Sequence, residues 1–324
     1  MQPKPPPFDA ELDAVLQVMA AEGSTLPDLT PEGIAAARQM LDAAVLDDEH
    51  LGRQGFFEVE DRVVPGPDGG PGVALLICRP SASSGPRPVI YHVHGGGMMM
   101  GNNRAGVDMI VDWARELNAV VVSVEYRLAP EHPHPAPVED VYAGLSWTAD
   151  HAREIGGDSE RIVIAGVSAG GGLAAALTLL LRDRKGPRPV GQLLMGPMLD
   201  DRNDAPSAHQ MQDLGVWDRT ANEAGWTALL GSRRGGPDVS PYAAPARAED
   251  LSGLPAAYLD VGSAETFRDE VVAYASRIWQ AGGVAELHVW PGGFHGFEGF
   301  APQAALARAA LDARLNWLRR LLAE

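Results

Sequence analysis

The chain has 324 residues, 45% of them hydrophobic, a length that suits one large α/β domain with an attached lid. Its formal net charge of −17 argues against nucleic-acid binding, because the phosphates would be repelled. The sequence contains no run apolar enough to span a membrane, no secretory signal and no second cysteine. It therefore predicts a cytoplasmic protein without a membrane span.

Two helices are predicted before any strand, at residues 8–21 and 31–46. Thr30 is a suitable N-cap for the second, with Pro31 at its first helical position. We expect residues 1–50 to form part of a cap and residues 51–324 to form the main domain. The single cysteine, Cys78, lies in a strand-like run and is expected to be a buried, unreactive thiol.

Apolar runs and helical segments alternate along the rest of the chain. Strands are predicted at residues 56–64, 73–79, 89–94, 120–125, 161–165, 191–195, 256–261 and 285–290. Helices are predicted at residues 104–117, 137–154, 170–184, 267–281 and 302–322. This βα alternation indicates a mostly parallel, eight-stranded sheet with helices on both faces. The first two strands have no helix between them and should form an antiparallel hairpin at one edge.

The alternation stops between Pro197 and Pro245, where polar and glycine-rich stretches contain no evident strand. We expect a cap insertion at about residues 200–245. Together with residues 1–50 it would cover the carboxyl ends of the strands, where open α/β sheets bind ligands.

A short glycine motif, Gly166-Val167-Ser168-Ala169-Gly170, separates a β-branched strand from an apolar helix. Glycine at both ends permits a tight turn, which would expose the Ser168 hydroxyl at the top of the sheet. A serine hydroxyl is a weak nucleophile unless a base accepts its proton. The motif therefore predicts a nucleophile that needs partners elsewhere in the chain.

Three glycines follow His94 directly after a predicted strand. Their unshielded amides can approach a substrate carbonyl closely and stabilise an oxyanion. We assign this role to the amides of Gly96 and Gly97, with that of Ala169 after the nucleophile. His94 itself is expected to shape the loop through hydrogen bonds rather than to act as a base.

The base is expected late in the chain, after the last strand, where glycines and two phenylalanines surround His295. An acid that orients this histidine should follow the preceding strand. Glu265 is favoured because it lies in the loop, whereas Asp269 falls inside the predicted helix and Asp260 inside the strand. His132 and His134 do not suggest a metal site, because no second cluster of ligands completes one.

These motifs together resemble the hormone-sensitive lipase family of α/β-hydrolase esterases, in its bacterial carboxylesterase branch. The resemblance spans most of the chain and includes the loop at His94–Gly97, the segment at residues 125–131, the elbow and the histidine loop. The family carries an Asp-Pro-Leu-Arg-Asp segment whose first acid is catalytic, and residues 265–269 align with it. Glu265 thus replaces the usual aspartate, and Val167 stands where many members carry an acid.

The resemblance implies an α/β-hydrolase fold with a helical cap, a small-molecule ester substrate and a covalent acyl-enzyme. It also implies that homodimers are common, and the chemistry requires no metal or organic cofactor. Lactone, amide or carbamate hydrolysis at the same site remains an alternative, as does a non-catalytic small-molecule receptor of this fold. An apolar pocket for short to medium acyl groups is expected from four residues, Met98, Trp217, Phe294 and Phe297.

Overall fold

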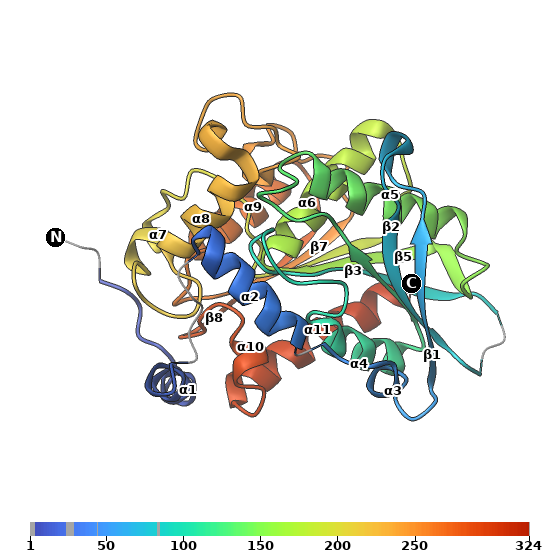
Figure 1. The fold of residues 1–324 in the computed structure, drawn as a ribbon, viewed down its shortest axis with the longest axis horizontal. Coiled ribbons are helices and arrows are strands. Elements are labelled where there is room, and N and C mark those ends of the chain that lie inside the picture. Colours follow the sequence, from blue (N-terminus) through green and yellow to red (C-terminus); the bar gives the residue numbers. More distant parts are fainter. Residues whose placement is uncertain (1–3, 24–28, 44, 83–84, 324) are drawn as a thin grey trace.

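The computed structural model describes residues 4–23, 29–43, 45–82 and 85–323 (Figure 1). One eight-stranded sheet runs through the molecule in the order β1-β2-β4-β3-β5-β6-β7-β8. The strands are β1 (Phe57–Val64), β2 (Val73–Pro80), β3 (Arg87–Val93), β4 (Val120–Glu125), β5 (Gly157–Val167), β6 (Gly191–Met195), β7 (Ala256–Gly262) and β8 (Ala285–Trp290). The mostly parallel eight-stranded sheet predicted from the sequence is confirmed. All strand pairs are parallel except β1 with β2 and β2 with β4.

The first two strands form the predicted antiparallel hairpin at one edge of the sheet. A short 3₁₀ helix, η1 (Pro67–Gly69), turns the chain between them. Strand β2 also pairs antiparallel with β4, so the hairpin extends the parallel sheet rather than standing apart from it.

Helices cover both faces of the sheet (Figure 1). Five of them pack on it directly: α4 (Val107–Leu117), α5 (Ala136–Asp150), α6 (Ala169–Arg184), α9 (Arg268–Gln280) and α11 (Ala305–Leu322). Neighbouring residues of β3 belong to opposite cores, because side chains of a strand alternate between its two faces. Val89 and Tyr91 belong to the core that includes residues of α5, α6 and α9, whereas Ile90 belongs to the core that includes residues of α4 and α11.

Three helices precede the sheet: α1 (Ala10–Ala21), α2 (Pro31–Ala43) and the short α3 (Asp48–Leu51). Thr30 is the N-cap of α2 as predicted, since its Oγ1 accepts the Gly33 amide at 3.2 Å. The predicted helix 31–46 includes Ala44, and the predicted unit 1–50 includes residues 1–3 and 24–28; these lie outside the described residues. The four-residue helix α3 was not predicted, because it is too short to show a helical repeat.

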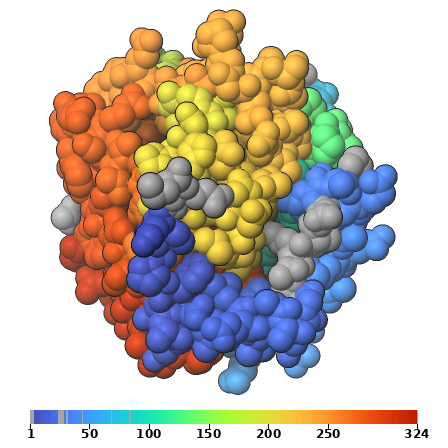
Figure 2. All heavy atoms as spheres, turned by 90° about the vertical axis from the view of Figure 1, so that its left-hand side faces the viewer, coloured from blue at the N-terminus to red at the C-terminus, as the bar shows by residue number. Residues whose placement is uncertain are grey.

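The insertion after β6 contains α7 (Pro206–Gln210), α8 (Arg219–Leu230) and the 3₁₀ helix η2 (Gly231–Arg233), and η3 (Pro245–Arg247) follows it. Residues 200–245 are all described and contain no strand. Figure 2 shows the yellow and orange atoms of this region beside the blue atoms of the N-terminal helices on one face of the molecule. None of the helices in the described part of the chain has the length and apolar character needed to cross a membrane.

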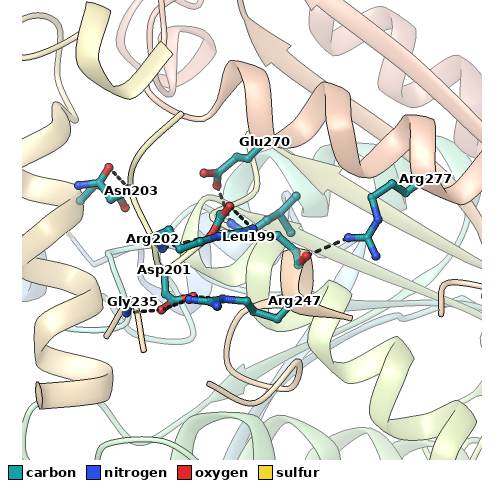
Figure 3. A network of polar contacts seen from close by, with 11 residues as sticks. Leu199, Asp201, Arg202, Asn203, Gly235, Arg247, Glu270 and Arg277 are labelled. Atoms are coloured by element: carbon teal, nitrogen blue, oxygen red, sulfur yellow. Dashed lines mark hydrogen bonds and ion pairs between the residues drawn. The ribbon is translucent and has the colours of Figure 1, made fainter. Parts of the chain in front are cut away.

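Buried polar contacts hold the start of the insertion in place (Figure 3). The carboxylate of Asp201, which is fully buried, accepts two hydrogen bonds from Arg247 at 2.7 and 3.0 Å and one from the Gly235 amide at 2.6 Å. Glu270 of α9 accepts the Leu199 amide at 2.7 Å. A buried, paired carboxylate is costly to expose alone, so these contacts join the two ends of the segment between β6 and β7 to each other and its start to α9.

Candidate active site

Ser168 lies at the sharp turn between β5 and α6. Its φ of 58° and ψ of −124° place it in a region that residues with a side chain rarely adopt. Close backbone packing around the turn leaves no room for side chains at the flanking glycines. A Cβ at Gly166 would lie 2.2 Å from the Gly170 oxygen, and one at Gly170 would lie 2.1 Å from the Val93 oxygen. The two glycines therefore permit the turn that holds Ser168 at the carboxyl end of β5.

A continuous chain of hydrogen bonds connects three of the predicted side chains. His295 Nε2 lies 2.8 Å from Ser168 Oγ, and His295 Nδ1 lies 2.6 Å from Glu265 Oε1. The other carboxylate oxygen of Glu265 accepts the Gly262 amide at 3.1 Å. Because a carboxylate only accepts hydrogen bonds, the proton of a neutral His295 is on Nδ1 and the Nε2 lone pair faces Ser168.

The two other candidate acids lie elsewhere. Asp269 accepts the Ser207 amide at 2.8 Å and pairs with Arg268 at 2.7 Å. Asp260 is fully buried and pairs with Arg314 at 2.7 Å. Of the three candidate carboxylates, Glu265 is the one that contacts His295.

The glycine loop after β3 lies against the elbow. A Cβ at Gly95 would lie 3.3 Å from the Ser168 Cβ, so the two segments touch. Gly96 and Gly97 both have positive φ, 107° and 62°, a conformation that glycine adopts without strain. Ala169 is the first residue of α6, where an amide has no acceptor within its own helix. The three amides assigned from the sequence therefore belong to segments that meet beside Ser168.

His94 supports this loop from behind. Its Nδ1 lies 2.8 Å from the Gly95 oxygen, and its ring stacks on Tyr126 with centroids 4.1 Å apart. Tyr126 in turn donates its hydroxyl to the His94 oxygen at 2.9 Å. Burial lowers the pKa of His94 to about 4, so the ring is neutral near pH 7 and its Nδ1 donates to the carbonyl.

The four expected pocket residues divide into two groups. Trp217 lies at the loop, because a Cβ at Gly97 would be 2.4 Å from its Cη2, and its ring centroid is 6.4 Å from that of His295. Met98 is fully buried beside the same glycines. Phe294 and Phe297 instead pack in a separate core with Leu12 of α1 and alanines of α11, and this packing accounts for both rings without a substrate.

Two contacts of His295 were not foreseen from the sequence. The Phe267 ring meets the imidazole edge to face, with centroids 5.1 Å apart. A Cβ at Gly196 would lie 3.4 Å from Glu265 Oε1 and 3.6 Å from His295 Nδ1. Phe267 lies in the loop that carries Glu265, and Gly196 directly follows β6. Their positions after predicted strands were the signal in the sequence that could have placed them near the site.

A buried charged cluster lies behind this hydrogen-bonded chain. Arg314 of α11 donates to Asp260 at 2.7 and 3.1 Å and to Glu298 at 2.7 Å. Glu298 belongs to the short helix α10 (Phe297–Phe300), directly after the histidine loop. A cavity of about 10 Å³, close to the space that one water molecule needs, is lined by all three residues and by Glu265 and His295.

Comparison with known proteins identifies the family. A family model described as an alpha/beta hydrolase fold matches residues 90–299. Esterase LipI of Mycobacterium tuberculosis is 35% identical over 294 residues, which cover 90% of this chain and 89% of LipI. Carboxylesterase NlhH of the same organism is 34% identical over 318 residues, 96% of this chain and 97% of NlhH.

A solved structure titled bacterial heroin esterase has a TM-score of 0.89 and 38% identity, with 97% of this chain and 98% of the other covered. Bovine hormone-sensitive lipase is 36% identical over a shorter segment of 110 residues, 34% of this chain and 15% of that protein. These similarities and the fold show that the chain belongs to the hormone-sensitive lipase-like carboxylesterases of the α/β-hydrolase superfamily, and that it is a carboxylic-ester hydrolase.

Proposed function

We propose that the protein hydrolyses carboxylic esters with short to medium acyl groups through a covalent acyl-enzyme on Ser168, with His295 as base and Glu265 as orienting acid. The observation that carries this proposal is the unbroken hydrogen-bonded chain from Ser168 Oγ through both ring nitrogens of His295 to Glu265. Nucleophile, acid and base also follow one another along the chain in the order typical of α/β-hydrolases, at Ser168, Glu265 and His295.

In the first half-reaction, His295 Nε2 accepts the proton of Ser168 as Oγ bonds to the ester carbonyl carbon. The carbonyl oxygen becomes an oxyanion, which the amides of Gly96, Gly97 and Ala169 stabilise. Glu265 stabilises the imidazolium through its hydrogen bond to Nδ1. The bond to the leaving alcohol then breaks, and His295 returns its proton to the alcohol oxygen.

In the second half-reaction, His295 removes a proton from water as the water oxygen attacks the acyl carbon. Collapse of the second oxyanion releases the carboxylic acid, and Ser168 Oγ regains its proton from His295. The preference for short to medium acyl groups is supported by the packing beside the glycine loop. Trp217 contacts Gly97, and a Cβ at Gly225 of α8 would lie 3.1 Å from the Gly97 oxygen, so the cap leaves limited room there.

Ser168→Ala is the first test. The variant lacks the nucleophile, so kcat/KM for chromogenic acetate and butyrate esters should fall by about 10³-fold or more, with an unchanged circular dichroism spectrum. Ser252→Ala, in an exposed turn, should behave as the wild type. A fluorophosphonate should add one equivalent of mass to the wild type and none to Ser168→Ala.

A panel of esters with increasing acyl length, together with matched lactones, amides and carbamates, tests the substrate class. Faster cleavage of long-chain triacylglycerols than of butyrate esters would contradict the proposed acyl range. Preferential cleavage of an amide or lactone would assign the same site to that reaction. Failure of the wild type both to turn over any substrate and to react with the fluorophosphonate would indicate a non-catalytic receptor.

A further inference from the structure

The N-terminal helix α2 sends one side chain to the glycine loop. Arg38 Nε donates to the Met99 oxygen at 2.7 Å, and Nη2 donates to the Ala129 oxygen at 2.9 Å. The same guanidinium binds the carboxylate of Glu131 in a two-pronged contact, with both distances 2.8 Å. One side chain, 61 residues before Met99 in the chain, therefore holds two loops of the main domain.

The two carbonyls that Arg38 binds belong to segments that also bind each other. The Ala129 amide donates to the Met98 oxygen at 2.9 Å. In the glycine loop, the Gly96 oxygen accepts the amides of Met99 and Met100, each at 3.0 Å. Met99 thus closes a turn that begins at Gly96 and contains Gly97, so its position constrains the backbone that carries both amides.

The shape of the guanidinium is suited to this task. It presents several donors in one rigid plane, whereas a lysine ammonium is a point charge on a flexible stem. Glu131 fixes the rotation of that plane, and hydrogen bonding to Arg38 lowers the pKa of Glu131 to about 2, so the pair is charged near pH 7. Because the Glu131 side chain is 56% exposed, the ion pair by itself adds little stability. Its main effect is to aim the other donors of Arg38 at the two carbonyls.

The neighbouring residues of α2 are compatible with a fixed helix. Ile34 and Ala37 are buried in the same core cluster as the three methionines that follow the glycine loop. Asp42, one turn after Arg38, accepts the side-chain amide of Asn102 at 3.0 Å. In Figure 2 the blue N-terminal segment lies next to the yellow residues of the insertion.

We propose that Arg38 is a positioning residue for the oxyanion loop, through which the N-terminal helix sets the direction of the Gly96 and Gly97 amides. The inference rests on the proposed function in one respect, namely that these amides stabilise the oxyanion. Amides that bind a transition state must be held close to their productive geometry. Loss of Arg38 therefore lowers kcat and leaves KM for a small ester nearly unchanged.

The test compares Arg38→Ala and Arg38→Lys with a control, Arg79→Ala, on a short chromogenic ester. Arg79 forms a similar pair with Glu58 at 2.8 Å, but on the edge hairpin away from the site. Removal of one oxyanion donor costs about 10²–10³-fold in kcat, so a loosened loop is expected to cost about 10- to 100-fold in Arg38→Ala. Arg38→Lys should be intermediate, and Arg79→Ala should match the wild type.

Chemical rescue distinguishes positioning from general destabilisation. Guanidinium chloride at tens of millimolar should restore part of the kcat of Arg38→Ala and should not activate the wild type or Arg79→Ala. A folded Arg38→Ala with wild-type kcat would overturn the proposal. A kcat loss that guanidinium leaves unchanged and that Arg38→Lys shares in full would also overturn it, because the donor geometry would then be irrelevant.

Hydrogen exchange of the peptide covering residues 95–104 gives a readout that needs no turnover. Exchange in this segment should be faster in Arg38→Ala than in the wild type, and unchanged in Arg79→Ala. Equal exchange in both variants would overturn the proposal. If the wild type cleaved no ester, the proposed function would fail by itself, and the exchange measurement would still decide whether Arg38 holds the loop.

Discussion

Glu265 uses its two carboxylate oxygens for different purposes. One accepts from His295 at 2.6 Å and the other from the Gly262 amide at 3.1 Å. The next residue, Thr266, donates its hydroxyl to the Trp217 oxygen at 2.7 Å. The acid loop is thus held by hydrogen bonds to the end of β7 on one side and to Trp217, in the segment between α7 and α8, on the other.

Glu265→Gln tests the acid at this position. The amide can present an N–H group to His295 Nδ1, which favours the wrong tautomer and removes the charge that stabilises the imidazolium. We expect kcat to fall by about 10²–10⁴-fold with little change in KM, measured on a short chromogenic ester. Asp269→Asn is the matched control, since its carboxylate binds Ser207 and Arg268 instead. An equal loss in both variants would contradict the role of Glu265.

The sequence predicts residues that carry their own local signal and misses those whose role depends on distant contacts. Ser168, His295 and the glycine loop stand at strand ends in recognisable motifs, and Glu265 could be ranked above Asp269 because it precedes the helix. Phe267 and Gly196 lie beside the histidine or its acid; both follow predicted strands, but that position does not distinguish them from the other residues of the same loops. Phe294 and Phe297 flank His295 in sequence, but consecutive loop residues point in different directions, and these two rings face α1 and α11.

At the scale of elements, the buried cluster of Arg314, Asp260 and Glu298 connects α11 to the loops that carry the acid and the base. Asp260 lies within β7, five residues before Glu265, and Glu298 follows His295 by three residues. Trp290 of β8 also donates to Asp260 at 3.0 Å. Arg314 is 16 positions from Glu298 and 54 positions from Asp260 in the chain, so periodicity alone does not pair them. The strands β7 and β8 and the helix α11 were nevertheless predicted from alternation of apolar runs, whereas the four-residue helix α10 that carries Glu298 was not.

Arg314→Met should destabilise the protein strongly. The substitution leaves two buried carboxylates without a cation, and breaking a buried ion pair costs about 3–5 kcal/mol. Urea unfolding at pH 7 measures the loss. Arg308→Met on the exposed face of the same helix is the control and should cost less than about 1 kcal/mol. Equal unfolding free energies for the two variants would show that the cluster contributes no more than a surface arginine.

At the scale of the whole molecule, buried titratable groups make stability depend on pH in opposite directions. Burial lowers the pKa of His92 to about 3 and that of His94 to about 4. Their neutral forms stabilise the fold above the unfolded pKa of about 6.5. That contribution is lost as the pH falls from there toward the folded values, because the unfolded chain then binds more protons. Glu125, at the end of β4, changes stability with pH in the opposite direction, because its pKa is raised.

Burial raises the pKa of Glu125 from 4.5 to about 7. Between these values the folded protein holds a proton that the unfolded chain has released, so stability falls as the pH rises through this window and stays reduced above it. Glu125→Gln removes the charge and keeps an oxygen for the Asn103 amide, which the carboxylate accepts at 2.6 Å. Urea unfolding should therefore show a gain of about 1–3 kcal/mol at pH 8 and almost none at pH 4. Glu131→Gln should show no such gain at pH 8, because Arg38 lowers the pKa of that carboxyl and the exposed pair adds little stability. A gain for Glu125→Gln that is equal at both pH values would show that packing, and not ionisation of the buried carboxyl, determines the difference.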